Sequence, residues 1–179
     1  LSYDYDGVKI HVEFGQSINR EDTIVVGISY VAKPNELEEG GSKAISSDKG
    51  LYFINPNGTE PFVPKQIWTQ GETEASSCWF PTIDSPNERT TQNIDITVKK
   101  NFTTLSNGLL VKSVENEDGT RTDYWEQKLG HTPYLAMMAV GEFKVVKDFY
   151  TRLDGSKMEV NYYVESEFEK DAKAIFGET

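Results

Sequence analysis

The stretch Gly108–Gln127, which reads GLLVKSVENEDGTRTDYWEQ, decides the fold class. It contains two runs rich in apolar and aromatic residues, Gly108–Val114 and Thr122–Gln127, on either side of the pair Asp118-Gly119. An Asp-Gly pair readily adopts the positive φ values of a tight hairpin turn, and short runs of this composition are typical of strands. The stretch therefore predicts an antiparallel β-hairpin.

The same pattern recurs at both ends of the chain. Asp6-Gly7 and Asp154-Gly155 also lie between strand-like runs, and Val8–Phe14 alternates apolar and polar residues with the period of a half-buried strand. Because such turns join alternating segments, the sequence predicts an all-β fold, either an antiparallel β-sandwich or a saddle-like domain. The other predicted strands are Thr23–Val31, Gly50–Ile54, Gln92–Val98, Tyr134–Val140, Glu142–Tyr150 and Lys157–Glu165.

One short C-terminal helix is predicted after the last strand. Ser166 followed by Glu169 has the spacing of a capping box, and Gly177 is placed to end the helix. The predicted apolar face consists of Phe168, Ala172, Ile175 and Phe176.

The composition favours a globular protein and argues against a nucleic-acid partner. The chain has 179 residues, 37% of them hydrophobic, and a formal net charge of −11. An acidic surface repels phosphate groups, so we expect no nucleic-acid partner. No run of 18 apolar residues predicts a membrane span. The first residue is Leu1 rather than Met, which suggests a processed chain or an excised domain, and the lone Cys78 allows no internal disulfide.

The sequence offers no catalytic or metal site of its own. Its two histidines, His11 and His131, are far apart and outside any H-E-x-x-H motif, so we expect His11 to be solvated and His131 to be structural or exposed. Cys78 has no neighbouring activator and is expected to be a buried, inert thiol. Glu72 and Glu74 form only a weak carboxylate pair, because an acidic chain offers many such pairs.

The most unusual local feature is a polar and aromatic stretch in the first half of the chain. It runs QIWTQGETE over Gln66–Glu74 and then CWFPTIDSPN over Cys78–Asn87. Binding residues are common in loops that join such groups on a β scaffold. From these residues alone, Glu72 fits a binding carboxylate or an exposed loop acid, and Gln70 fits a binding amide or a turn-stabilising one.

This stretch resembles the T-Q-x-E … F-P-x-x-D-x-P signature in the N-terminal β domain of the gluzincin zinc aminopeptidases. Four further segments resemble that family in the same order along the chain. They are Leu51–Phe53, Leu105–Gly108, Thr132–Ala136 and Val140–Phe143. Thr82 and Ser85 depart from the family's F-P-C-x-D-E-P pattern, where a cysteine and a glutamate are common.

The resemblance implies a domain organisation and a role. Residues 1–165 would be the N-terminal β domain, with its first strands missing, and residues 166–179 would begin the linker or helix into an absent catalytic domain that binds zinc. The substrate would be a peptide with a free N-terminus. Glu72 would approach its α-ammonium group and Gln70 would line the pocket for its first side chain. This chain alone would have no catalytic or metal-binding residues and would be inactive.

Two alternatives remain open at this point. One is a scaffold or protein-interaction domain of a catalytically inactive relative. The other is a free-standing β-sandwich binding module, which an exposed aromatic platform of Trp68, Trp79 or Trp125 would favour. The sequence leaves the compartment undecided between a bacterial envelope and the cytoplasm.

Overall fold

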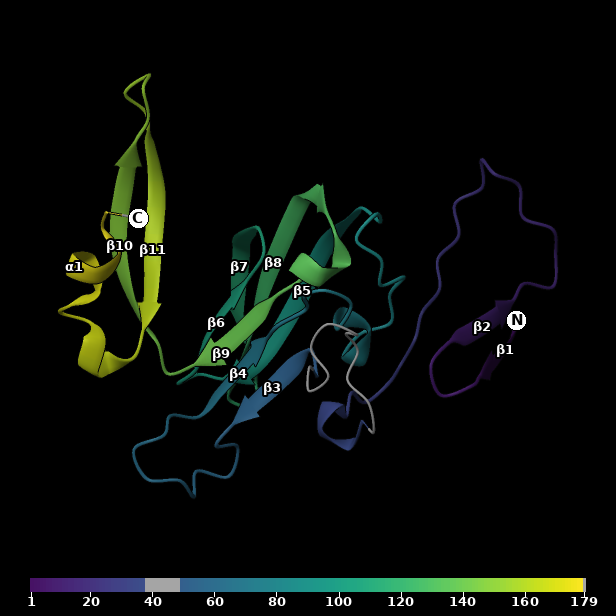
Figure 1. Cartoon of the computed structure of the whole chain (residues 1–179), viewed down its shortest axis with the longest axis horizontal. Coiled ribbons are helices and arrows are strands. Elements are labelled where there is room, and N and C mark those ends of the chain that lie inside the picture. The colour runs from purple at the N-terminus through teal and green to yellow at the C-terminus, as the bar shows by residue number, and fades with distance from the viewer. Residues whose placement is uncertain (38–48, 179) are drawn as a thin grey trace. The chain divides into compact units, whose positions relative to one another are not determined.

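The computed structural model describes residues 1–37 and 49–178, and it divides into two compact units, Leu1–Tyr30 and Val31–Thr179 (Figure 1). The first contains an antiparallel hairpin of β1 (Ser2–Tyr5) and β2 (Ile10–Glu13). The Asp6-Gly7 pair forms its turn, with Gly7 at a φ of 97°, as predicted.

The predicted strand Thr23–Val31 is wrong. This segment pairs with no strand among the described residues, and its apolar side chains are exposed, with Val25 at 92%. A run rich in β-branched residues favours an extended chain, but a strand also needs a neighbour that accepts and donates its backbone hydrogen bonds. The sequence pattern gives the first property and not the second.

The described residues of the second unit form two antiparallel sheets and a separate hairpin. One sheet has four strands in the order β3-β4-β9-β6, and the other has three in the order β5-β8-β7. In the separate hairpin β10 pairs with β11. The strands are β3 (Leu51–Ile54), β4 (Gln66–Thr69), β5 (Thr90–Lys99), β6 (Thr103–Ser106), β7 (Leu109–Glu115), β8 (Thr120–His131), β9 (Met138–Gly141), β10 (Lys144–Thr151) and β11 (Lys157–Val164).

Side chains from the two sheets pack into one continuous core. Ile96 and Trp125 from the three-stranded sheet meet Val140 from the four-stranded sheet. A second cluster around Leu51 and Trp79 shares partly buried neighbours with the first. Alternate residues of each sheet therefore face inward, which is the packing of a β-sandwich. The all-β prediction is confirmed.

Short helical turns connect the strands. The 3-10 turns are η1 (Pro34–Glu36), η2 (Ser76–Cys78), η3 (Pro133–Leu135) and η4 (Ser166–Phe168), and the α-helix is α1 (Ala172–Phe176). The predicted strand Tyr134–Val140 is thus only partly right, because its first residues lie in η3 and only Met138 onward joins β9. The fixed φ of Pro133 suits the first position of a helical turn and explains the difference.

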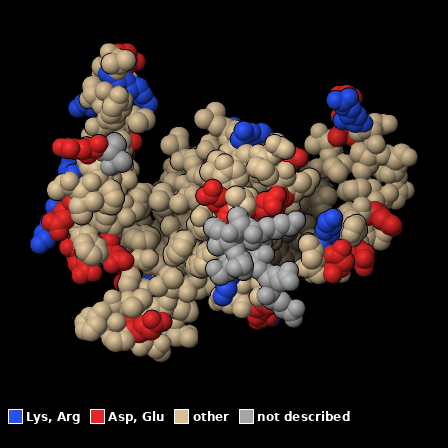
Figure 2. All heavy atoms as spheres, viewed as in Figure 1, with Lys and Arg blue, Asp and Glu red and all other residues tan. Residues whose placement is uncertain are grey.

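The C-terminal helix is confirmed, but its predicted start is not. Ser166 caps nothing with its side chain and lies inside η4, so α1 begins six residues later, at Ala172. Gly177 follows the helix as predicted. A groove of about 300 Å³ is lined by the apolar residues of this region together with β4 and β11. Figure 2 shows a group of acidic side chains beside η4, where Glu167, Glu169 and Asp171 are exposed.

Candidate functional site

The T-Q-G-E segment forms a loop that leaves β4 at Thr69 and reaches η2. Its backbone is held at both ends: the Gln70 N–H donates to the Gly50 carbonyl at 3.0 Å, and the Ala75 N–H donates to the Gly71 carbonyl at 3.0 Å. The side chains of Gln70 and Glu72 are exposed, and neither makes a side-chain hydrogen bond or ion pair within the described residues. The loop therefore presents an amide and a carboxylate two residues apart.

Gly71 explains why the loop lies close to η3. A Cβ atom at this position would lie 2.5 Å from the Tyr134 carbonyl oxygen and 2.7 Å from Ser76 Oγ. Ser76 is fully buried, and its hydroxyl donates to the Pro133 carbonyl at 2.8 Å. The loop and the turn before β9 are thus in direct contact, with room for only a glycine between them.

Aromatic packing and one carboxylate support the other end of the loop. Trp79 is buried and meets Phe80 edge to face, with ring centroids 4.5 Å apart. The Asp84 carboxylate accepts the Ser77 N–H at 2.8 Å, which fixes the turn after η2. Asp84 therefore shapes this turn, and Trp79 and Phe80 pack against each other next to it.

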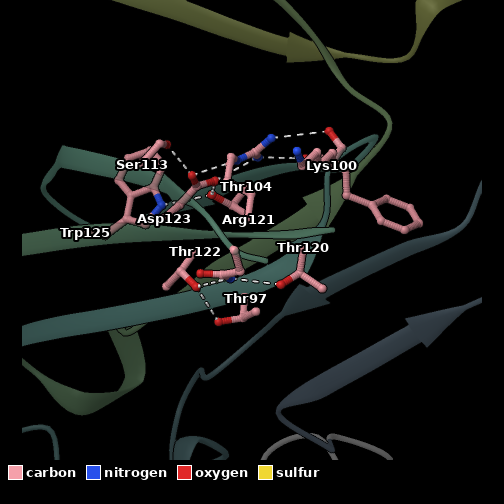
Figure 3. Close-up of polar contacts among 11 residues, drawn as sticks. Thr97, Lys100, Thr104, Ser113, Thr120, Arg121, Thr122, Asp123 and Trp125 are labelled. Carbon is pink, nitrogen blue, oxygen red and sulfur yellow. Dashed lines mark hydrogen bonds and ion pairs between the residues drawn. The ribbon is translucent and has the colours of Figure 1, made fainter. Parts of the chain in front are cut away.

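A second polar cluster lies between the sheets, and sequence reasoning missed it. Figure 3 shows Asp123 of β8 between Arg121, Thr104 and Ser113. Arg121 Nε and Nη2 donate to the two Asp123 carboxylate oxygens at 2.8 and 2.9 Å, the Thr104 hydroxyl donates at 2.7 Å, and the Ser113 hydroxyl donates as well. Trp125 Nε1 in turn donates to Thr104 at 3.0 Å. Both oxygens of the buried Asp123 carboxylate accept hydrogen bonds from the protein, an arrangement typical of a structural role.

The cluster decides the charge state of Asp123. Burial of the carboxyl group, which is 2% exposed, favours its neutral form. The hydrogen bonds from Arg121, Ser113 and Thr104 and the charge of the guanidinium outweigh burial and hold the pKa of Asp123 below its ordinary value. The same contact raises the pKa of Arg121. Asp123 therefore stays ionised inside the sandwich.

A signal for this cluster exists in the sequence. Asp123 and Trp125 are two residues apart in a strand and so lie on the same face, and Arg121 precedes them on that face. An acid on the core face of a strand requires a partner, because an unpaired buried charge is costly.

The histidines and the cysteine form no catalytic group in the described residues. His11 is exposed, with its Nε2 atom 3.6 Å from the Asp6 carboxylate, as predicted for a solvated side chain. His131 is buried, and its Nδ1 atom lies 3.0 Å from the Thr132 carbonyl, which is a structural position. Cys78 is half-buried.

Residues 1–37 and 49–178 contain no group of three or more His, Cys, Asp or Glu side chains that could hold a metal ion. Within the same ranges, no helix combines the length and the apolar content that crossing a membrane requires.

The tryptophans do not form the platform that a free-standing binding module would need. Trp79 and Trp125 are 8% and 6% exposed and belong to the core. Trp68 is 40% exposed, but its ring stacks on Tyr52 with centroids 4.6 Å apart. One partly covered ring offers little flat surface to a ligand, so the structure counts against this alternative.

Residues 2–135 match the family model of the peptidase M1 N-terminal domain. The match covers most of the chain and includes the loop with Gln70 and Glu72, so the chain belongs to this family. The resemblance to aminopeptidases in the sequence is thereby confirmed, and the peptidases of the M1 family are hydrolases.

Known relatives agree with the assignment. The chain is 31% identical over 99 residues to the probable M1 family aminopeptidase 2 of Encephalitozoon cuniculi, an alignment that covers 54% of this chain and 11% of the relative. It is 28% identical over 104 residues to subunit 2 of the transcription initiation factor TFIID of Gallus gallus, covering 56% of this chain and 9% of the relative. The chain thus spans about a tenth of the length of these curated relatives.

A solved structure shows the same fold. Aminopeptidase A of Legionella pneumophila, crystallised in complex with aspartic acid, superimposes with a TM-score of 0.57 and 20% sequence identity. The superposition covers 59% of this chain and 13% of that one.

Proposed function

We propose that this chain is the N-terminal domain of a zinc aminopeptidase, in which Glu72 binds the α-ammonium group of a peptide substrate and Gln70 lines the pocket for its first side chain. One observation carries the proposal: in a domain that belongs to the M1 N-terminal family, Gly71 packs tightly, while the two side chains beside it are exposed and have no side-chain partner among the described residues. Residues 166–179 would then lead into the catalytic domain.

Because Glu72 is exposed, tight binding of an amine requires a second part of the protein that covers the loop and excludes water. In water, an ion pair between a carboxylate and an ammonium contributes only about 0.2–1 kcal/mol. In a desolvated cleft the same charge-assisted hydrogen bond contributes about 1.5–3 kcal/mol. Glu72 therefore binds an amine tightly only when another part of the polypeptide covers the loop. On its own, this chain binds peptides weakly and does not hydrolyse them.

Zinc, which the family resemblance implies, does not fit the described residues, because no three ligand side chains lie close together there. We assign its ligands to the catalytic domain. The part played by the described residues is substrate binding: holding the terminal amine fixes how far the first peptide bond can reach into the cleft, which is a positioning contribution to the rate.

The test is the aminopeptidase activity of the full-length protein on a panel of aminoacyl anilides, with and without a chelator. Glu72→Ala should lower kcat/KM at least about tenfold, which corresponds to about 1.4 kcal/mol of lost transition-state stabilisation. Glu117→Gln, at an exposed acid in the turn between β7 and β8, is the control and should leave kcat/KM unchanged. Chelator-sensitive activity that survives Glu72→Ala would remove Glu72 from the site.

The likeness to TFIID subunit 2 favours a second candidate, a scaffold in which the same β domain makes protein contacts. That relative is named as a transcription factor subunit and not as a peptidase. A folded, zinc-loaded full-length protein with no turnover on any anilide would support the scaffold and overturn the aminopeptidase.

A further inference from the structure

The turn between β6 and β7 reaches the chain just before β9 through one side-chain amide. Asn107 Oδ1 accepts the Met137 N–H at 2.7 Å, and Asn107 Nδ2 donates to the Leu135 carbonyl at 2.9 Å. The preceding residue adds a third bond, since the Ser106 hydroxyl donates to the Met137 carbonyl at 2.7 Å. Between η3 and β9, these side-chain hydrogen bonds take the place of the backbone hydrogen bonds that a strand would make with its neighbour.

Asn107 is held in place by a tight turn. Gly108, the next residue, has a φ of +83°, and a Cβ there would lie 2.0 Å from the Glu126 carbonyl oxygen. Only glycine permits this approach of the β6–β7 turn to β8. Asn107 itself is half-buried, so its amide is partly shielded from competing water.

The segment that Asn107 holds is the one on which the T-Q-G-E loop rests. Ser76, fully buried, donates to the Pro133 carbonyl, and the Gly71 backbone lies against the Tyr134 carbonyl. A shift of η3 would therefore move the backbone between Gln70 and Glu72. The contacts form a continuous path from Asn107 through residues 133–137 to the loop.

We propose that Asn107 is a positioning residue for substrate recognition: its amide fixes residues 135–137 and η3, and η3 sets the place of Gln70 and Glu72. The inference rests on the proposed function for the roles of those two residues. The path itself consists of hydrogen bonds and close contacts in this chain.

Asparagine is suited to this position because it offers an acceptor and a donor on one planar group. Aspartate has the same shape and keeps the acceptor for Met137, but when ionised it cannot donate to the Leu135 carbonyl. Asn107→Asp therefore removes one bond with little change in volume. Asn116, in the turn between β7 and β8, provides a matched control, since its amide donates to the hydroxyls of Thr120 and Thr122 at the start of β8 and not to η3.

Hydrogen exchange of the full-length protein tests the path. In Asn107→Asp, amides of residues 70–80 and 134–137 should exchange about fivefold faster, the factor expected from one lost hydrogen bond. Amides of β5 and β8 should be unchanged, and Asn116→Asp should leave residues 70–80 unchanged. Equal acceleration throughout the sandwich, or no acceleration at residues 70–80, would overturn the inference.

A kinetic measurement tests the consequence for recognition. The readout is the ratio of kcat/KM for an aminoacyl anilide to kcat/KM for its des-amino analogue, a ratio that general destabilisation does not change. Asn107→Asp should lower this ratio roughly fivefold. If Glu72→Gln lowers the ratio and Asn107→Asp does not, the positioning role is wrong. If neither variant lowers it while exchange at residues 70–80 accelerates, the proposed function is wrong, and the recognition role of Asn107 fails with it.

Discussion

Asp123 and Glu72 are two carboxylates that this domain treats in opposite ways. Asp123 is 2% exposed and receives hydrogen bonds from three side chains. Glu72 is exposed and has no partner among the described residues. Both oxygens of the Asp123 carboxylate accept hydrogen bonds from the protein, whereas the Glu72 carboxylate accepts none from the described residues.

The comparison separates the part of the molecule that holds the fold from the part that is available for binding. A buried, paired acid is costly to disturb, because removing its charge leaves a guanidinium without its partner. An exposed acid on a rigid loop contributes little to folding and can be used elsewhere. The backbone under Glu72 is nevertheless fixed by Gly71 and Ser76, so its free side chain starts from a defined place.

The largest expected effect is on stability, from Asp123→Asn. The substitution leaves Arg121 with a neutral partner whose amide group faces the guanidinium donors, so the free energy of unfolding should fall by about 3 kcal/mol. Chemical denaturation measures this loss. Glu72→Gln is the matched comparison and should change the free energy of unfolding by less than about 0.5 kcal/mol. Similar losses in the free energy of unfolding for the two variants would show that Asp123 and Glu72 do not differ in their contribution to stability.

The pH dependence of this stability difference tests whether the charge of Asp123 is its cause. Because the folded-state pKa of Asp123 lies below its unfolded value of about 3.9, its ionised form stabilises the fold above that pH. This contribution is lost as the pH falls through the folded-state pKa. The difference in stability between the wild type and Asp123→Asn should be constant from about pH 7 to pH 5 and should shrink below about pH 4. A difference that persists undiminished well below that range would show that charge is not its cause.

A smaller effect is expected from Gly71→Ala, which tests the rigid base of the loop. The new Cβ would meet the Tyr134 carbonyl oxygen at 2.5 Å, so the loop or η3 must shift, at a cost of about 2 kcal/mol in the free energy of unfolding. Thermal or chemical unfolding measures it. Gly15→Ala, where a Cβ meets nothing within 4 Å, should change the free energy of unfolding by less than about 0.5 kcal/mol. An equally small change for Gly71→Ala would mean that the loop is not held against η3.

Much of the fold follows from short-range signals in the sequence. The Asp-Gly pairs place three hairpin turns correctly, because positive φ is a local requirement that glycine meets at no steric cost. Thr23–Val31 has an equally strong strand pattern and forms none, because pairing depends on residues far along the chain. The start of α1 was missed for a related reason: Ser166 has the right spacing for a cap, but the chain continues through a 3-10 turn first.

The candidate site was only partly accessible from the sequence. The T-Q-G-E motif identified Gln70 and Glu72, the structure shows that both side chains are exposed, and their roles stay predictions. Asn107 and Ser76 act through contacts with residues about 30 and 57 positions away, which no local pattern reveals. The partners of Asp123 likewise come from three different strands.

The most direct test of the binding role of Glu72 is a thermodynamic cycle that combines one substitution in the protein with removal of the α-amine from the substrate. It compares wild-type and Glu72→Gln full-length protein on an aminoacyl anilide and its des-amino analogue, using kcat/KM for all four combinations. The proposal predicts a coupling of at least about 1.5 kcal/mol between the Glu72 carboxylate and the α-ammonium group, the size of a desolvated charge-assisted hydrogen bond. A coupling below about 0.5 kcal/mol in a folded, active protein would contradict it, since an exposed ion pair contributes that little.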